Sequence, residues 1–209
     1  MLSTKRQAGY TLVEILIAMV LAVGSLAAVS SLVGYGIGVN GNLINSARLN
    51  EELGNVYALL LSDLRRTGYS GATVPMVTDP DANPSPFNGS VVVSEFPGEQ
   101  INSCILFSYD RNNNGGLDTL VPDERYGYRL RDGAVEIRRN GAACGDVGWE
   151  DLTDDDVIDV TALTFIVNQS VDNGITTTAI SVRLNGELAS NDSFSREYQT
   201  VVVVRNYDS

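Results

Sequence analysis

The stretch YTLVEILIAMVLAVGSLAAVSSLV, residues 10–33, decides the fold of this chain. No charged residue occurs between Glu14 and Arg48, and the run from Ile15 to Val33 is almost wholly apolar. A helix of this length is long enough to cross a bilayer core of roughly 30 Å. We therefore expect a membrane-spanning helix over about residues 12–33.

The residues before this run indicate its orientation. Lys5, Arg6 and the amino terminus are the only positive charges there, so the positive-inside rule leaves the N-terminus in the cytoplasm. Everything after Val33 is then extracytoplasmic.

Residues 5–14 read KRQAGYTLVE, a basic leader followed by a glycine, an aromatic residue and a T-L-x-E sequence that opens the apolar run. Gly9 supplies a flexible bond without a side chain before the helix, as a membrane-embedded peptidase needs. The segment resembles the signal of type IV prepilins. The resemblance implies a cytoplasmic leader over residues 1–9, cleavage between Gly9 and Tyr10 by the prepilin peptidase, and methylation of the Tyr10 amine by the same enzyme.

Glu14 is unusual because an ionised carboxylate at the edge of a membrane helix is costly unless it is paired. The resemblance implies a partner, the methylated N-terminal amine of the neighbouring subunit in a filament. An alternative interpretation is an ordinary signal peptide cut after Ser25-Leu26-Ala27, a pattern that the acidic Glu14 fits poorly.

The helix is predicted to continue to Gly68, which gives one long N-terminal helix over residues 10–68. Four glycines between residues 34 and 41 weaken it and predict a soft joint. Beyond them a one-sided apolar stripe at helical spacing should pack on a sheet. Its members are Leu49, Leu53, Val56, Leu60 and Leu64.

Residues 63–71, DLRRTGYSG, resemble the segment found at this position in PilW-like minor pilins. That resemblance favours a pilus over the pseudopilus of a type II secretion system. Members of the group often carry a cysteine next, whereas this chain has Ala72, so a disulfide from that point is impossible here.

Residues 69–209 are predicted to form a β-rich head domain. Residues 74–88 read as an exposed loop, and runs rich in Val, Ile, Thr, Tyr and Phe follow, separated by turn residues. These runs cover residues 90–96, 103–109, 126–131, 134–139, 159–168, 177–185 and 197–205. Asp132-Gly133 predicts a hairpin turn, and the absence of alternating helices predicts a mainly antiparallel sheet. The fold class is therefore α+β, with the long helix across one face, and the resemblance implies the lollipop shape of a pilin.

Charge limits the partners of the head domain. It holds nine of the 14 basic residues and 22 of the 26 acidic residues, a balance of −13 that disfavours nucleic-acid binding by the domain as a whole. Cys104 and Cys144 lie in the exported part, where an oxidising compartment favours a disulfide between them.

Residues 110–118, DRNNNGGLD, match the first half of a calcium-binding loop. Asp110, Asn112, Asn114 and Asp118 are the side-chain ligands in this interpretation. The match ends at Val121, where a bidentate glutamate is expected, and the alternative is an Asn/Gly-rich turn. A second acidic cluster, Asp151 to Asp159, reads as a solvated turn or helix cap, and Trp149 as a core or interface anchor.

The sequence lacks histidine and carries no recognisable nucleophile, phosphate loop or acid pair, so we expect no enzyme. The resemblance implies a minor pilin that acts in pilus assembly with other major and minor pilins. It would stand in the inner membrane with a periplasmic head before assembly, and in a cell-surface pilus afterwards. A type II secretion pseudopilin and a membrane-anchored periplasmic calcium-binding module are the alternatives.

Overall fold

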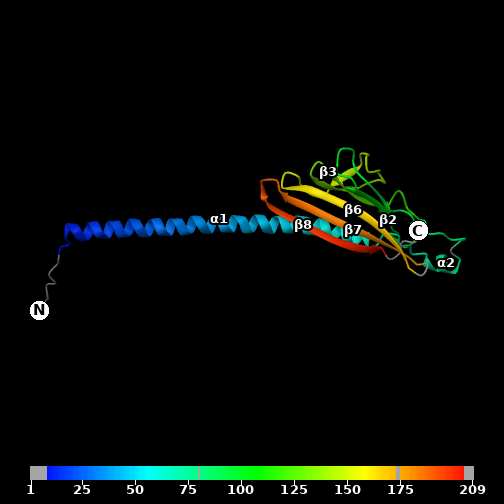
Figure 1. Cartoon of the computed structure of the whole chain (residues 1–209), viewed down its shortest axis with the longest axis horizontal. Helices are drawn as coiled ribbons and strands as arrows, with labels where there is room; N and C mark the ends of the chain where they lie inside the picture. Colours follow the sequence, from blue (N-terminus) through cyan, green and yellow to red (C-terminus); the bar gives the residue numbers. More distant parts are fainter. Residues whose placement is uncertain (1–8, 80, 173–174, 205–209) are drawn as a thin grey trace. The chain divides into compact units, whose positions relative to one another are not determined.

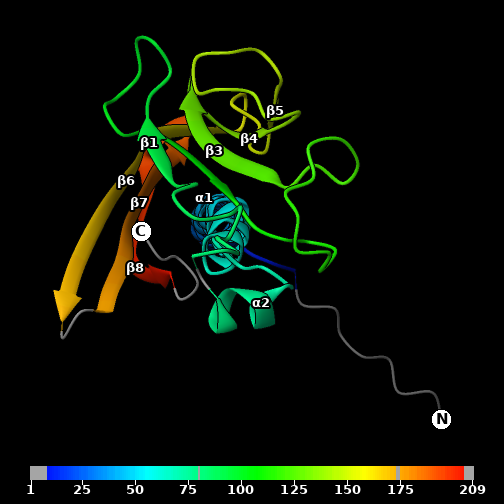
Figure 2. The same cartoon turned by 90° about the vertical axis from the view of Figure 1, so that its right-hand side faces the viewer.

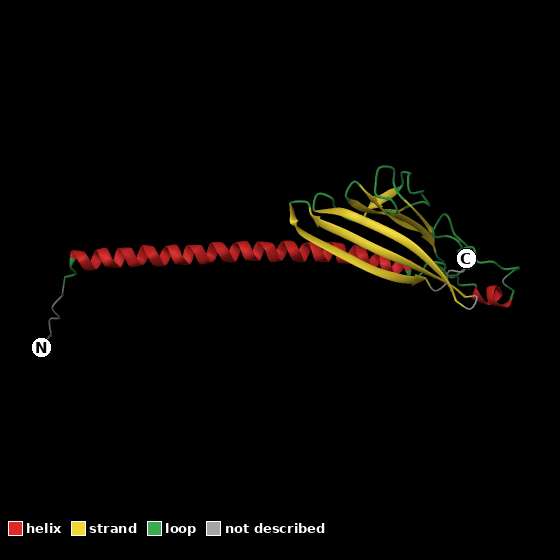
Figure 3. Ribbon diagram, viewed as in Figure 1, coloured by secondary structure: helices red, strands yellow, loops and turns green. Residues whose placement is uncertain are grey.

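The computed structural model describes residues 9–79, 81–172 and 175–204 (Figure 1). Along these residues the chain forms two helices and eight strands (Figure 3). The helices are α1 (Leu12–Leu64) and α2 (Thr73–Thr78). The strands are β1 (Val92–Ser94), β2 (Cys104–Ser108), β3 (Arg125–Arg131), β4 (Ala134–Arg138), β5 (Trp149–Asp151), β6 (Ile158–Asp172), β7 (Ile175–Leu188) and β8 (Asn191–Val204). The chain divides into two compact units, one up to Asn45 and one from Ser46 onward.

The first unit is the apolar part of α1. It has the length and hydropathy of a membrane span, with none of its most apolar window buried by protein. Residues 12–44 are exposed throughout. A helix satisfies its own backbone hydrogen bonds, which makes it one of the few structures that lipid tolerates.

In the second unit, α1 provides the centre of the core. The five predicted stripe residues are all buried, and they belong to one apolar cluster with residues from both sheets. Figure 2, a view along the helix, shows β6, β7 and β8 on one side of α1 and the strands of the other sheet on another side. The predicted packing of the helix on a β-sheet is therefore confirmed.

The first sheet is five-stranded, in the order β1-β2-β3-β4-β5, and every neighbouring pair is antiparallel. Its central hairpin is the predicted one: Arg131 pairs with Ala134, and the turn residues Asp132 and Gly133 have φ of 49° and 80°. Two successive positive φ values are those of the turn that matches strand twist. The Asp-Gly sequence therefore fixes the register of β3 and β4.

The second sheet is three-stranded and antiparallel, in the order β6-β7-β8. It lies close enough to α1 that Gly186 of β7 has little room for a side chain: an added Cβ would meet both terminal methyl groups of Leu53 at 3.0 Å. Polar contacts support the same packing, because Arg196 donates to the side chains of Asn50 and Ser46 at 2.7 and 2.9 Å.

Cys104 and Cys144 form the predicted disulfide, with a Cα–Cα distance of 6.0 Å. Cys104 opens β2, and Cys144 lies in the loop between β4 and β5. The bond therefore ties that loop to the sheet.

Several features differ from the sequence prediction. The strands form two sheets instead of one, and β6, β7 and β8 are longer than the predicted runs. The helix ends at Leu64, and turn residues carry the chain to Gly68, whose φ is 77°. The predicted loop after Ala72 contains α2, where the Thr78 hydroxyl donates back to the Val74 carbonyl at 2.9 Å. Strand β5 was not predicted, because its three residues, two of them acidic, are too few to show the alternation of apolar and polar residues that is typical of a strand.

Reduction of the disulfide should destabilise the head. The bond closes a loop with a sequence separation of 40 residues, which is worth about 4 kcal/mol in the chain-entropy model and several degrees in thermal midpoint. Calorimetry of the full chain in detergent, with and without reductant, measures the shift. The Cys104→Ala/Cys144→Ala variant should melt at the reduced midpoint and ignore reductant. An unchanged wild-type midpoint after complete reduction would contradict the prediction.

Candidate functional site

The predicted cleavage point lies in non-helical chain directly before α1. Gly9, Tyr10 and Thr11 are outside the helix and exposed, and apart from Gly9's chain neighbours no described group lies within 4 Å of the position that a Gly9 Cβ would occupy. The rest of the predicted leader, residues 1–8 with Lys5 and Arg6, falls outside the described residues. Among the described residues, nothing covers the Gly9–Tyr10 bond.

Thr11 and Glu14 cap the start of α1. Glu14 Oε2 accepts hydrogen bonds from the Thr11 backbone N–H at 2.8 Å and from the Thr11 hydroxyl at 3.0 Å, while the Glu14 N–H donates to that hydroxyl at 3.3 Å. This reciprocal arrangement is a capping box. Glu14 therefore has a role within its own chain. The T-x-x-E spacing of Thr11 and Glu14 is typical of a capping box. The pairing of Thr11 with Glu14 was not predicted from the sequence.

The glycine-rich segment between residues 34 and 41 is helical in the structure, since α1 continues through it without a break. The predicted soft joint is therefore regular helix in this state. Whether it loosens in a filament stays a prediction.

The end of α1 is held by a buried carboxylate. The Asp63 oxygens accept hydrogen bonds from the hydroxyls of Tyr128 at 2.6 Å and Tyr109 at 3.2 Å. Burial, and then the nearby Asp63, raises the pKa of both tyrosine hydroxyls. Both hydroxyls therefore stay protonated as donors. A carboxylate near a helix C-terminus opposes the helix dipole, and these two hydrogen bonds offset that cost.

The glycines of the DLRRTGYSG segment let the chain run close to β2 and the loop after it. The Gly68 N–H donates to the Ser108 carbonyl at 3.0 Å, and the Asp110 N–H donates to the Tyr69 carbonyl at 2.8 Å. A Cβ on Gly71 would lie 2.7–2.9 Å from backbone atoms of Asn113. The segment joins the helix to the sheet, which is a structural reason for its composition.

Two buried carboxylates organise the loop between β2 and β3. Asp110 accepts from the N–H groups of Asn113, Gly71 and Gly115 at 2.6–2.8 Å. Glu124 accepts from the N–H groups of three further loop residues, Arg111, Asp118 and Asn112, at 2.7–3.4 Å. Burial alone would raise the pKa of the Asp110 carboxyl, but its N–H donors outweigh burial and hold the pKa below its usual value.

The four predicted calcium ligands do not all share one partner. The side-chain amides of Asn112 and Asn114 both donate to Asp118 Oδ2 at 2.8 Å, so these three side chains meet. Asp110 instead points its oxygens at backbone N–H groups. Within the described ranges, no three Asp, Glu, His or Cys residues are grouped to hold a metal ion. The calcium interpretation stays a prediction.

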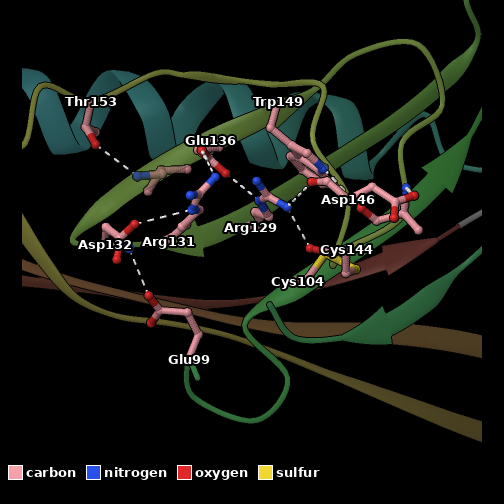
Figure 4. Close-up of polar contacts among 12 residues, drawn as sticks. Glu99, Cys104, Arg129, Arg131, Asp132, Glu136, Cys144, Asp146, Trp149 and Thr153 are labelled. Atoms are coloured by element: carbon pink, nitrogen blue, oxygen red, sulfur yellow. Dashed lines mark hydrogen bonds and ion pairs between the residues drawn. A yellow bond between two sulfur atoms is a disulfide. The ribbon is translucent and has the colours of Figure 1, made fainter. Parts of the chain in front are cut away.

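Sequence analysis missed the buried arginine at the centre of the first sheet. Arg129 is fully buried and pairs with Glu136 on β4, and its Nη1 donates to the carbonyls of Cys144 at 2.7 Å and Asp146 at 2.8 Å (Figure 4). Its guanidinium lies over the rings of Trp149 at 4.5 Å and Phe96 at 4.8 Å. Arg129 thus holds the disulfide-bonded loop independently of the disulfide.

The signal for this pair was available, because the Asp132-Gly133 turn places Arg129 opposite Glu136. Trp149, predicted to be a core or interface anchor, is half-buried, and its indole N–H donates to the Ala143 carbonyl at 3.1 Å. The other acidic cluster forms a turn in which the Asp156 N–H donates to the Asp154 side chain at 3.2 Å. Asp154, Asp155 and Asp156 are exposed.

Comparisons with known proteins agree with this architecture. The model of the family "Prepilin peptidase-dependent protein B" matches residues 42–204, and that of the prokaryotic N-terminal methylation motif matches residues 4–29. No solved structure matches the chain.

Two curated proteins are similar to this chain. An uncharacterized protein of Haemophilus influenzae is 23% identical over 199 residues, which cover 76% of this chain and 80% of that protein. Prepilin peptidase-dependent protein B of Escherichia coli is 30% identical over 57 residues, which cover 26% of this chain and 30% of that protein. Because the family model spans nearly the whole of the head and the last part of α1, the chain belongs to the prepilin peptidase-dependent protein B family, a family of type IV prepilin-like proteins.

Proposed function

We propose that the chain is a minor pilin of the PilW-like kind, a subunit of a type IV pilus that acts in pilus assembly. The observation that carries the proposal is the arrangement of the N-terminus: an exposed Gly9–Tyr10 bond outside the helix, followed at once by an apolar helix that retains Glu14. Membership of a prepilin family supports processing by the prepilin peptidase. Cleavage after Gly9 and methylation of the Tyr10 amine are parts of the proposal.

Glu14 is proposed to pair with the methylated Tyr10 amine of a neighbouring subunit. In the single chain both of its bonds to Thr11 reach Oε2, and Oε1 has no hydrogen-bond partner in the described part of the chain. A charged amine at Oε1 would complete the hydrogen bonding of the carboxylate. In a membrane, where an unpaired charge costs several kcal/mol, that completion favours addition of a subunit.

The choice of a pilus over a type II secretion pseudopilus rests on the DLRRTGYSG resemblance. The contacts of Asp63, Gly68 and Gly71 give this segment a structural role in joining helix to sheet. A pseudopilus therefore remains the alternative filament, since both machines need such a joint.

The proposed location follows from the same residues. Before assembly α1 anchors the chain in the inner membrane, with the leader in the cytoplasm and the head in the periplasm. After assembly the chain is part of a pilus at the cell surface, among other major and minor pilins. We assign it no catalytic activity, in keeping with the structural nature of pilin-like families.

The second candidate function is a membrane-anchored calcium-binding module. The observation that favours it is the meeting of Asn112, Asn114 and Asp118 on the exposed side of the loop. Two amide oxygens and a carboxylate are ligands that calcium accepts. Binding would require both amides to turn their oxygens toward the ion.

The mature protein should begin at Tyr10 with a methylated amine. Mass spectrometry of the N-terminal peptide from membrane-extracted protein measures both features. Gly9→Val puts a branched side chain at the cleaved bond, and we expect it to retain residues 1–9. A wild-type start at Ala28 would mean ordinary signal peptidase cleavage and would end the filament proposal.

Glu14→Gln should fold and insert but fail to enter filaments. Glutamine keeps the capping hydrogen bonds of a capping box but lacks the charge that would attract an amine. Thr11→Ala is the matched control, because it removes the two hydrogen bonds of the Thr11 hydroxyl, keeps the backbone one and keeps the charge. The amount of each variant in sheared filaments, relative to its amount in membranes, is the readout. Normal recovery of Glu14→Gln would show that capping, not charge pairing, is the role of Glu14.

Asp110→Asn should lower the thermal midpoint by several degrees in the presence of a chelator, because three N–H groups lose a charged acceptor worth about 2–3 kcal/mol. Since the folded-state pKa of Asp110 is lowered, the carboxylate stabilises the fold above its ordinary pKa. The difference between wild type and variant should shrink as the pH falls through the folded-state pKa.

The same melting experiment tests calcium. Binding to the folded state raises the midpoint with the logarithm of the calcium concentration, and Asp118→Asn should abolish that rise. A wild-type midpoint that ignores millimolar calcium would remove the calcium-module alternative.

A further inference from the structure

A pocket lies where α1 ends and β2 leads into the loop after it. It has a volume of about 310 Å³, the lower end of the range for ligand-binding pockets. It is lined by Arg66, Tyr69, Tyr109, Asp110, Arg111 and Asn113. We call it the Arg66–Arg111 pocket.

Arg66 and Arg111 share the lack of an ion pair with Arg48, Arg65, Arg138 and Arg196 among the described residues. Arg138 and Arg196, however, are held by hydrogen bonds to neutral oxygen atoms. Arg125, Arg129, Arg131, Arg139 and Arg183 all form ion pairs. Arg66 and Arg111 are exposed, and neither lies within ion-pair distance of a carboxylate in the described residues. The pocket therefore presents two unpaired guanidinium groups on a domain whose balance is strongly acidic.

The one carboxylate in the pocket does not neutralise them directly. Asp110 is 2% exposed, and both of its oxygens are occupied by backbone N–H donors. Its negative charge stays, so the lining side chains alone, two arginines and one aspartate, have a formal sum of +1. Two further carboxylates lie behind the lining, Asp63 on the Tyr109 hydroxyl and Glu124 on the Arg111 N–H. An incoming anion would meet the guanidinium groups and not the buried Asp110 oxygens.

The aromatic part of the pocket is held rigidly. The Tyr109 ring stacks on the Tyr126 ring with centroids 4.1 Å apart, and its hydroxyl is bonded to Asp63. Tyr69, in contrast to the buried Tyr109, is 38% exposed, so its ring is accessible to a ligand. A preformed site loses little entropy when a ligand is ordered in it.

We propose that the Arg66–Arg111 pocket binds a carboxylate-bearing peptide segment of a neighbouring filament subunit. Guanidinium groups form short, strong hydrogen bonds with carboxylates, and the tyrosine rings contact the apolar part of the same segment. Charge complementarity selects this occupant, because an acidic head repels an equally acidic neighbour except at a basic point. The assignment of the segment to a neighbouring subunit rests on the proposed function, whereas the preference of the pocket for a carboxylate does not.

The chemistry is tested with a peptide and the full chain in detergent. The probe has the sequence of residues 150–157, an acidic segment of this protein that contains the exposed Asp154, Asp155 and Asp156, and its control carries amides in place of the carboxylates. Calorimetric titration should show binding of the acidic peptide and none of the control. Equal binding of both peptides, or binding of neither, would overturn the proposal.

Arginine variants locate the site. Arg66→Gln/Arg111→Gln should weaken binding of the acidic peptide by about tenfold or more, as expected for the loss of charged hydrogen bonds. Arg65→Gln is the matched control: Arg65 is the neighbouring residue, is also exposed and lies outside the pocket. An equal loss in Arg65→Gln would mean a nonspecific charge effect and would overturn the assignment.

The source of the segment is tested in filaments, with a photo-crosslinking amino acid in place of Tyr69. The adduct in sheared filaments should map to an Asp- or Glu-bearing segment of another subunit and be lost in the double arginine variant. An adduct to lipid or to a segment without carboxylates would overturn the partner assignment. If the protein is missing from filaments altogether, the proposed function fails, while the peptide titration still decides the chemistry of the pocket.

Discussion

The buried stripe of α1 is the contact on which the rest of the head depends. Leu49, Leu53 and Leu60 are at most 1% exposed, and they share one apolar cluster with strands of both sheets. The β6-β7-β8 sheet has only three strands and one buried face, so without the helix its apolar side chains would face water. Both sheets therefore contribute side chains to the same cluster as these leucines.

Helix α1 is therefore suited to two environments, lipid along its first part and the protein core along its last part. Up to residue 44 its side chains are exposed all round, as lipid requires, and from Leu49 they are buried on one side only. The change in pattern, not a break in the backbone, separates membrane anchor from head, since α1 is continuous from Leu12 to Leu64. Its first turn is capped by its own Thr11 and Glu14, so the helix start needs no partner to be stable.

Periodicity and turn chemistry were enough to predict the helix, the Asp132-Gly133 hairpin and most strands, because each depends on neighbours in sequence. The direction in which a carboxylate points does not depend on sequence neighbours alone, so it could not be predicted in this way. Asp110 fits a calcium loop and equally fits a carboxylate that collects N–H groups, and only the course of the chain at Gly71 distinguishes them. Arg129 was missed for a related reason: an arginine in a strand reads as exposed until its cover, Phe96 and Trp149, is known.

In the proposed filament, the charges of the head would limit how subunits meet. The carboxylates of Asp63, Asp110 and Glu124 accept hydrogen bonds from hydroxyl and N–H donors inside the head. Arg129 is likewise held inside the head, by its hydrogen bonds to the loop between β4 and β5. The charges left at the surface are mostly acidic, which keeps separate heads apart. Close contact between heads then requires a basic point, and Arg66 and Arg111 lie together at the end of α1. Helix α1 thus begins at the capped Glu14 and ends beside the Arg66–Arg111 pocket, the two places proposed to contact another subunit.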